Sequence, residues 1–351
     1  MLPPFNYKYV MPAEWYPHAA TWLTWPHNSR TWEASILSQV KHTFAQIIAA
    51  ITADGNEKVN ININNSQEEK EIIDLLTKQG VNIEYVQFYE IPSNDAWCRD
   101  HGPIFVINSD NNLENPIAIT NWEFNSWGNK YPFEQDNQIP IRIAASINLP
   151  IFSTGIILEG GSIDVNGEGC LLTTRSCLLN PNRNPHLSQQ EIEEHLCSWL
   201  GVHKILWLEE GIVGDDTDGH IDDIARFASP STILYAIETN EQDENFAILQ
   251  RNYQLLKSFT NTENKPFELI PIPMPQALYY NGARLPATYL NFYITNSAVL
   301  VPTFGDSTTE EIALSKIQSV FPDRKIIGID CRALIVGLGA IHCVTQQQPA
   351  L

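Results

Sequence analysis

The sequence contains few cysteines and no closely spaced cysteine pair. The six cysteines form no C-x-x-C motif and are Cys98, Cys170, Cys177, Cys197, Cys331 and Cys343. Short cysteine spacings are typical of zinc knots and of disulfide frameworks, so both are disfavoured. We therefore expect reduced thiols, most of them buried in the core.

Basic residues are scarce as well. The chain has 21 Lys and Arg against 41 Asp and Glu, which gives a formal net charge of -20. Because a negative field repels phosphate, this composition argues against nucleic acid and against anionic membranes as partners. The same field attracts small cations, although for the charge taken alone an effect on solubility is the simpler interpretation.

Targeting and membrane segments are not indicated. Residues 1–6 lack a basic region followed by an apolar stretch, so they do not resemble a signal peptide. The longest apolar run, residues 333–344, is interrupted by glycines and is too short to cross a bilayer. We expect a cytoplasmic protein.

Cofactor motifs are missing too. Residues 337–340 lack the third glycine and the following helix of a dinucleotide fingerprint. The acidic run that begins at Gly214 fails as an EF-hand loop, because Gly214 and Ala225 would occupy positions that need carboxylates. A transition-metal site is a weak alternative, since no H-E-x-x-H or comparable spacing connects the candidate ligands His101, His220, Asp222, His342 and Cys343. We expect no cofactor and no metal.

What the chain does contain is a repeated pattern of elements. Two β-rich runs separated by a polar turn are followed by a helix and a short strand, roughly every 50 to 65 residues. The predicted paired runs are 104–107 with 117–120, 162–165 with 170–174, 224–228 with 232–236, and 289–295 with 298–301. Helices are predicted at 32–53, 67–79, 138–148, 188–200, 245–261 and 307–321, with strands at 58–63, 82–88, 150–152, 202–207, 267–271 and 325–329.

Three of these helix starts carry a Ser followed three residues later by Glu, the capping-box pattern. These are Ser66, Ser188 and Ser307. Five units fit if residues 20–25 pair with a last strand at 341–346, which would close the units into a ring. The alternative is an ordinary three-layer α/β sandwich. No low-complexity linker divides the chain, so we expect a single domain over residues 1–351.

Chemically useful side chains recur at the starts of these units. Asp100 precedes the first paired run, Glu159 precedes the second, His220 and Asp222 begin the third, and Cys343 opens the last strand. In a ring of repeats, equivalent positions gather at one end of the central axis, so these five side chains are expected to converge.

Such a set suits attack on a cationic carbon. Asp100 and Asp222 would each take a pair of N–H donors from a guanidinium group, and Cys343 would attack its carbon as a thiolate. His220, oriented by Glu159, would protonate the departing ammonia and then activate water. Taken singly, each residue has a simpler interpretation, as a buried cysteine, a structural His–Asp pair, a turn or a surface ion pair. Their joint placement favours catalysis.

The chain resembles the agmatine deiminase family, similar also to bacterial peptidylarginine deiminases, within the guanidine-modifying superfamily. The segments that carry the resemblance are residues 11–15, 95–103, 122–128, 158–162, 214–223 and 341–349. The resemblance implies a five-bladed α/β propeller of ββαβ modules with pseudo-fivefold symmetry, and an oligomer. It also implies Cys343 as nucleophile, His220 and Glu159 as acid–base partners, Asp100 and Asp222 as guanidinium clamps, and hydrolysis of agmatine to N-carbamoylputrescine and ammonia in putrescine biosynthesis.

Substrate choice can be argued from charge. Agmatine ends in an ammonium, which needs an anion or an aromatic face, and Asp216 and Trp97 are our candidates for these. Alternatives are a deiminase of peptidyl-arginine or of another guanidine, and a noncatalytic polyamine-binding protein. Two departures from the family pattern bear on the pocket. Leu338 replaces a glycine near the nucleophile, where it disfavours positive φ and adds bulk, and Asn129 replaces a glycine more mildly.

Overall fold

The chain adopts a mixed α/β fold built from small sheets. The computed structural model describes residues 2–108 and 115–351, and in these residues the strands form five sheets of three or four strands together with a two-stranded hairpin. Each sheet contains one antiparallel pair and at least one parallel neighbour. A parallel neighbour needs a crossover connection, which explains the alternation of strand pairs and helices in the sequence.

Four of the sheets follow one plan, in which an antiparallel pair leads through a helix to a parallel third strand. The first three are β4 (Ile104–Ile107), β5 (Ile117–Glu123), α5 (Ile139–Ile147) and β6 (Ile151–Ile157); β7 (Asp164–Val165), β8 (Cys170–Thr174), α7 (Gln189–Leu200) and β9 (Lys204–Leu208); and β10 (Ala225–Ser229), β11 (Thr232–Ile237), α8 (Glu244–Leu256) and β12 (Glu268–Pro273). The fourth is β15 (Tyr293–Ile294), β16 (Ala298–Thr303), α9 (Ser307–Val320) and β17 (Lys325–Asp330), and the hairpin β13 (Tyr279–Tyr280) and β14 (Ala283–Arg284) precedes it.

The remaining sheet joins the two ends of the described chain. Its order is β18 (Gln346–Pro349), β1 (His18–Thr24), β2 (Lys58–Ile63) and β3 (Val86–Glu90), with α1 (Ala34–Thr52) and α2 (Gln67–Lys78) as crossovers. β1 runs antiparallel to β18, with Trp22 opposite Gln346, and parallel to β2. The predicted pairing of the first and last strands is therefore confirmed. β3 and α2 form the extra piece that the repeat pattern did not accommodate.

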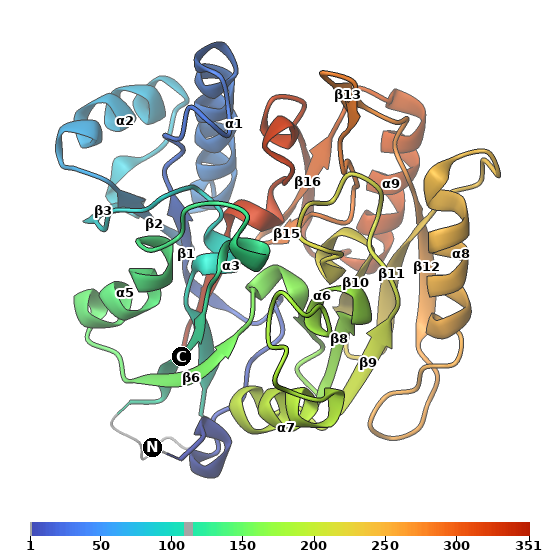
Figure 1. The fold of residues 1–351 in the computed structure, drawn as a ribbon. Coiled ribbons are helices and arrows are strands. Elements are labelled where there is room, and N and C mark those ends of the chain that lie inside the picture. Colours follow the sequence, from blue (N-terminus) through green and yellow to red (C-terminus); the bar gives the residue numbers. More distant parts are fainter. Residues whose placement is uncertain (1, 109–114) are drawn as a thin grey trace.

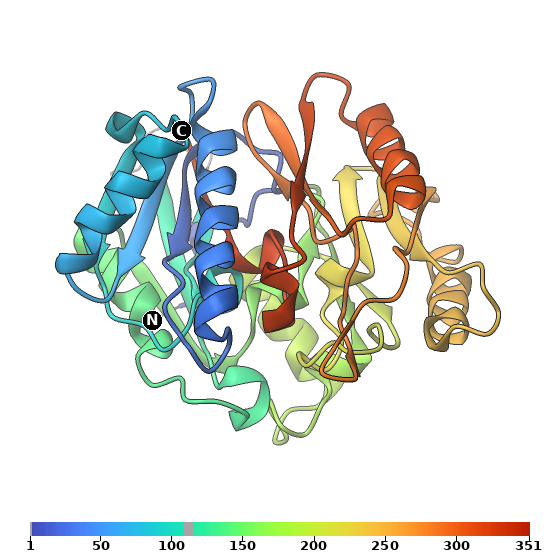
Figure 2. The same ribbon diagram turned by 90° about the horizontal axis from the view of Figure 1, so that it is seen from above.

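The long helices lie at the periphery, outside the sheets (Figure 1). Each buries one face: in α1, the apolar residues Val40, Phe44, Ile47 and Ile51 are fully buried and pack with the largest core cluster. Seen from above, the segment that contains residues 334–344 lies near the centre, between α1 and the later units (Figure 2). No helix among the described residues has the length and apolar character that crossing a bilayer requires.

Several predicted strands start or end elsewhere. The last strand was expected at 341–346, but His342–Val344 form a 3₁₀ turn and β18 begins at Gln346. The reason is that the backbone amides of His342 and Cys343 donate to Asn291 rather than to a neighbouring strand. Cys343 thus precedes the last strand and does not open it.

Three further strands also start later than predicted. The run 289–295 contributes only Tyr293–Ile294 to a sheet, because Arg226 takes the carbonyl oxygens of Leu290 and Phe292 as hydrogen-bond acceptors. Gly160–Ser162 form a 3₁₀ turn, so β7 begins at Asp164. The strand predicted at 82–88 likewise starts later, at Val86, after a 3₁₀ turn over Ile83–Tyr85.

The helix-start predictions had mixed outcomes. Ser188 caps α7 in a complete capping box with Glu191, as predicted. Ser66 makes no side-chain capping bond, and α9 is capped by Asp306, one residue before Ser307. Glu310 instead accepts from the amides of Phe304 and Gly305. α8 stops at Leu256, five residues earlier than the predicted end at 261.

Candidate active site

A pocket of about 610 Å³ contains two of the predicted catalytic residues and both predicted substrate-binding residues. Cys343 and Asp100 lie in its wall, together with Trp97 and Asp216. Its size is within the usual range for small-molecule sites. His220, Glu159 and Asp222 are fully buried and lie behind this wall.

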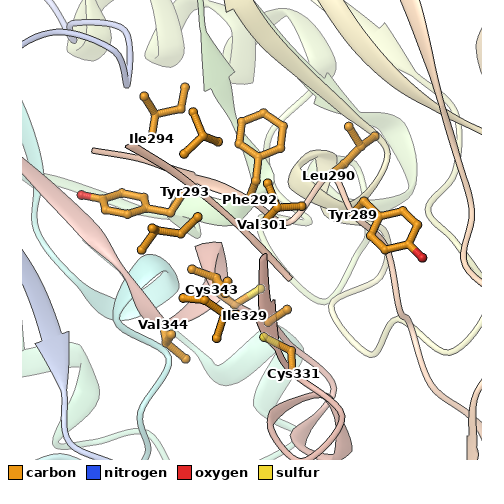
Figure 3. Close-up of a cluster of buried hydrophobic side chains, with 14 of the residues drawn as sticks. Tyr289, Leu290, Phe292, Tyr293, Ile294, Val301, Ile329, Cys331, Cys343 and Val344 are labelled. Carbon is orange, nitrogen blue, oxygen red and sulfur yellow. The ribbon is translucent and has the colours of Figure 1, made fainter. Parts of the chain in front are cut away.

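Cys343 is held at the pocket wall by Asn291. The Asn291 side chain accepts from the amide of Cys343 at 3.3 Å, and its Nδ2 contacts the sulfur at 3.1 Å. Apolar side chains, among them Val344 and Ile329, lie around the turn that contains Cys343 (Figure 3). Burial raises the pKa of the Cys343 thiol well above its usual value, and Asp222, Asp223 and Asp100 raise it further. The thiol is therefore neutral in the empty pocket.

Asp100 belongs to a single helical turn, α3 (Cys98–His101), whose N-terminal neighbour is Trp97. Its two carboxyl oxygens accept from the backbone amide of Gly161 and from Trp127 Nε1, both at 3.0 Å. Burial raises the pKa of Asp100 well above its usual value, and the charges of Asp222 and Glu159 add to this. In the empty pocket Asp100 therefore tends to hold a proton.

His220 and Asp222 follow a tightly folded acidic loop. Asp215 shapes this loop by accepting from the amides of Thr217 and His220, and Gly219 adopts φ +105°, where a side chain would meet Ser176 and Gly211. The His220 ring has no hydrogen-bond partner in residues 2–108 and 115–351, and burial lowers its pKa to about 3. His220 is thus a neutral base in the empty site.

Asp222 contacts Cys343 directly. Its Oδ2 lies 3.8 Å from the Cys343 sulfur and accepts from His342 Nδ1 at 2.6 Å, whereas Oδ1 has no partner among the described residues. Burial raises the pKa of Asp222, but the hydrogen bond and charge of His342 outweigh burial, so the net shift is downward. Of the two predicted clamps, Asp222 is therefore the one that stays ionised in the empty pocket.

Only one carboxylate oxygen of Glu159 is paired among the described residues. Oε1 pairs with Arg183 Nε at 2.5 Å, while Oε2 has no partner there. The side chains of Glu159 and Arg183 are fully buried. Arg183 also bonds Asp218 and the carbonyl of Thr217, so it connects Glu159 to the acidic loop. Burial raises the pKa of Glu159, although Arg183 opposes that shift.

The five predicted catalytic residues come together around Gly161. A methyl group at Gly161 would lie 2.6 Å from His220 Nδ1, 2.7 Å from Asp100 Oδ1 and 3.2 Å from Asp222 Oδ2. His220 Nδ1 is 3.7 Å from Asp100 Oδ1, and a ring nitrogen of His220 is within 4.8 Å of a carboxylate oxygen of Glu159. With Cys343 beside Asp222, the predicted cluster exists as a geometric unit.

Replacing Gly161 by alanine should therefore disable the site without unfolding the chain. The added methyl group must displace His220 or Asp100, and a shift of about 1 Å in reacting groups costs about 100-fold in rate. We expect kcat/KM to fall by about that factor while the thermal midpoint moves little. A matched change is Gly328→Ala, where the methyl group meets only Thr303 and Leu314 outside the pocket. Equal activity losses in the two variants would contradict this account.

Trp97 and Asp216 line the pocket, but Asp216 is not free. Lys130 Nζ pairs with its Oδ1 at 3.3 Å, and the Tyr131 hydroxyl donates to its Oδ2 at 2.7 Å. Trp97 packs against Trp32, and a side chain at Gly339 would meet the Trp97 ring at 2.5 Å and Cβ of Cys343 at 3.1 Å. Glycine at 339 thus lets the indole approach the nucleophile.

The two departures at glycine positions have different outcomes. Leu338 adopts φ 72° although the sequence predicts that leucine disfavours it, and the side chain lines the pocket. Leucine therefore carries backbone strain at this position and narrows the site. Asn129 takes φ 63°, as expected for a residue that tolerates left-handed geometry.

One cluster among the described residues has metal-ligand chemistry, and it is not the predicted one. Glu159, Cys177 and His220 bring ligand atoms within 4.8 Å of one another. Arg183 already donates to Glu159, and its Nη2 lies 3.9 Å from the Cys177 sulfur. A guanidinium charge therefore occupies the place that a metal cation would need.

Sequence reasoning missed three residues that support this site: Arg183, Glu14 and His342. Arg183 lies in a polar segment between two prolines at 181 and 185, and its pairing with Glu159 had no local signal. Glu14 and His342 fall within segments that carry the resemblance, but Glu14 was given no role and His342 was considered only as a candidate metal ligand. They bond each other at 2.7 Å across 328 positions.

Comparison with known proteins identifies the family. The model of the Porphyromonas-type peptidyl-arginine deiminase family matches residues 10–349. Agmatine deiminase of Medicago truncatula is 36% identical over 378 aligned positions, covering 99% of this chain and 98% of that protein. The solved agmatine deiminase of Enterococcus faecalis has a TM-score of 0.90 at 31% identity, covering 99% and 98% of the two chains. A cysteine-to-serine variant of C. jejuni agmatine deiminase with substrate bound has a TM-score of 0.86 at 32% identity, covering 97% and 96%. This chain belongs to the Porphyromonas-type peptidyl-arginine deiminase family.

Proposed function

We propose that this protein is an agmatine deiminase, which hydrolyses the guanidinium of agmatine to N-carbamoylputrescine and ammonia in putrescine biosynthesis. The observation that carries the proposal is the contact of the Cys343 sulfur with Oδ2 of Asp222, whose Oδ1 accepts no hydrogen bond from the described residues. Full-length likeness to proteins named agmatine deiminase supports it.

Binding would begin with the two carboxylates. Asp222 is ionised before the substrate arrives, whereas Asp100 tends to be protonated. A guanidinium ion between them favours the charged form of Asp100, so binding should release its proton. The ion would then be held by two carboxylates through charge-assisted hydrogen bonds, with its carbon facing Cys343.

The chemistry follows from the protonation states of the empty site. The substrate cation favours the Cys343 thiolate, and neutral His220 accepts the thiol proton. The thiolate adds to the guanidinium carbon, and the imidazolium of His220 returns the proton to the nitrogen that leaves as ammonia. His220 next deprotonates water, which attacks the thiouronium carbon and expels the Cys343 thiolate, leaving the ureido product. The free oxygen of Glu159 stabilises the imidazolium in both steps.

Substrate length would be set at the other end of the pocket. We place the ammonium of agmatine near Asp216, with its aliphatic chain along Trp97. Because Lys130 already pairs with Asp216, the ammonium competes with that lysine rather than meeting a bare charge. Peptidyl-arginine is the second candidate, since the matching family model is described by that activity.

A substrate panel tests the proposal. Agmatine, arginine, and peptides with N-terminal or C-terminal arginine are compared by ammonia release and ureido product. We expect agmatine to have the highest kcat/KM, and Asp216→Asn to raise its KM by about tenfold because one charged partner is lost. Asp54→Asn, at a surface pair with Lys325, is the control for KM. Turnover of peptides alone would mean that the second candidate is correct.

We also infer the finer architecture. Four consecutive units that share one plan, together with the fifth sheet that pairs β1 with β18, support a five-bladed α/β propeller with pseudo-fivefold symmetry and one catalytic domain over residues 1–351. The active site would then lie on its axis, where the unit starts converge. Assembly into a homo-oligomer and a cytoplasmic location stay predictions.

A further inference from the structure

We propose that His342 is a positioning residue for the reaction: by bridging Glu14 and Asp222, it keeps the Asp222 carboxylate ionised and leaves one of its oxygens free for the guanidinium. The inference rests on the proposed function, because it concerns how that site binds a cation. It concerns a residue adjacent to the nucleophile whose side chain is held by carboxylates on both sides.

The geometry of the bridge is tight. His342 Nδ1 is 2.6 Å from Asp222 Oδ2, and Nε2 is 2.7 Å from Glu14 Oε2. All three side chains are buried, with at most 4% of any of them exposed. Water therefore does not weaken these contacts, and each one has to be satisfied within the protein.

Proton counting fixes the direction of the bond to Asp222. Two carboxyl groups flank one imidazole, so the two hydrogen bonds require two protons among the three groups. Glu14 contacts Arg99 at 3.3 Å and Arg226 at 3.0 Å, and it accepts from the amide of Ile294. Burial raises the pKa of Glu14, but Arg226 and His342 outweigh it, and the net shift is downward. Burial lowers the pKa of His342, and Arg226 and Arg99 lower it further, so the ring holds its second proton weakly. Glu14 already has three other donors, whereas Asp222 is contacted only by His342 and the Cys343 thiol among the described residues. The first ring proton is therefore stabilised most on Nδ1, where it donates to Asp222.

This donation decides how Asp222 meets the substrate. Oδ2 is occupied by His342 and lies 3.8 Å from the Cys343 sulfur. Oδ1 has no partner among the described residues and is buried. A buried carboxylate without a donor would normally take up a proton, and burial does raise the pKa of Asp222. Without His342, Asp222 would enter the binding step protonated.

Several charged or titratable groups surround this bridge from other elements, and any pH dependence includes them. They are Arg99 and Asp100 of α3, Arg226 of β10, Glu14 of the N-terminal segment, His220 and Asp223 on either side of Ile221 and Asp222, and Cys343 itself. Among these groups, Asp100 already makes agmatine binding weaken as the pH falls, because its pKa is raised and it loses a proton on binding. This weakening at low pH is the acid limb of binding.

The sign of the effect follows. A carboxyl group with a depressed pKa is ionised over the working range, and it is protonated only well below that range. Removing the donor raises the pKa of Asp222, so a second proton must leave when the cation binds. The acid limb of binding then steepens from about tenfold per pH unit, for one proton, toward about 100-fold, for two.

Two substitutions of His342 separate positioning from packing. The amide nitrogen of asparagine can take the place of Nδ1, and that of glutamine can take the place of Nε2. His342→Asn therefore keeps a donor to Asp222, whereas His342→Gln keeps the contact with Glu14. Both are made in the Cys343→Ser background, and agmatine binding is titrated by calorimetry from pH 8 downward. We expect His342→Gln to steepen the acid limb and His342→Asn to preserve the slope of the parent.

The control is His18→Gln, a buried histidine that also bridges two oxygens, those of Glu57 and the backbone of Glu14, but contacts no carboxylate of the site. It should leave the slope unchanged. Equal slopes in His342→Gln and the parent would overturn the inference, as would an effect of the same size in both His342 variants. Failure of the proposed function looks different, since the unsubstituted enzyme would then release no ammonia from agmatine.

Discussion

Replacing Cys343 by serine should abolish ammonia release from agmatine, by at least ~10⁴-fold, while agmatine still binds. The hydroxyl is a poorer nucleophile than the thiol and does not ionise beside Asp222, Asp223 and Asp100. Binding persists because the guanidinium contacts come from Asp100 and Asp222, which the substitution leaves intact. Single-turnover ammonia release and calorimetric binding measure the two effects separately.

The matched control is Cys197→Ser, which changes a half-buried thiol on α7 outside the pocket. Turnover in this variant should equal that of the unsubstituted enzyme. A Cys343→Ser enzyme that still releases ammonia at a similar rate would exclude the covalent route and would leave a noncovalent hydrolysis by His220.

Asp222→Asn should cost about 1,000-fold in kcat/KM, most of it through KM. Truncating one charge of a buried, hydrogen-bonded pair costs about 2–5 kcal/mol, and the substrate cation loses its preformed anion. The amide also presents a donor toward the His342 ring, so the bridge to Glu14 rearranges. Initial rates over a range of agmatine concentrations give the division between KM and kcat.

Asp223→Asn is the paired control because burial favours the neutral form of this neighbouring carboxyl group. Burial raises the pKa of Asp223 well above its usual value, and Asp222 and Asp215 raise it further, so an amide replaces a carboxylic acid of the same shape. Its Oδ1 accepts from Asn291, and an amide oxygen can do the same. Little change is expected here, and a loss as large as that of Asp222→Asn would show that the effect is not due to the guanidinium contact.

Local patterns predicted much of the fold. The repeated pattern of elements located each long helix of the described residues, and Ser188 with Glu191 predicted the α7 cap, because both signals depend on residues that are close in sequence. Ser66 carries the same pattern without making the bond, since a capping pattern permits the geometry and does not enforce it. The error at 341–346 arose because Asn291, 51 positions away, captures the amide of His342.

The residues of the candidate site could likewise be predicted only in part. Asp100, Glu159, His220, Asp222 and Cys343 could be grouped because each stands at the start of a unit. The supporting partners could not, since nothing near Glu159 in the sequence marks Arg183, and Glu14 meets His342 across nearly the whole chain. Such pairings depend on the packing around the centre of the molecule, and a single sequence does not specify that packing in advance.

The pairing of β1 with β18 also bears on the order of folding. Trp22 of β1 bonds Gln348 of β18 across 326 positions of the chain. Contacts between residues so far apart in sequence form slowly, because closing a long loop costs entropy before the contact stabilises it. We therefore expect β1 to keep an open edge until the two segments meet, and Cys343, which lies just before β18, to reach Asp222 only at that stage.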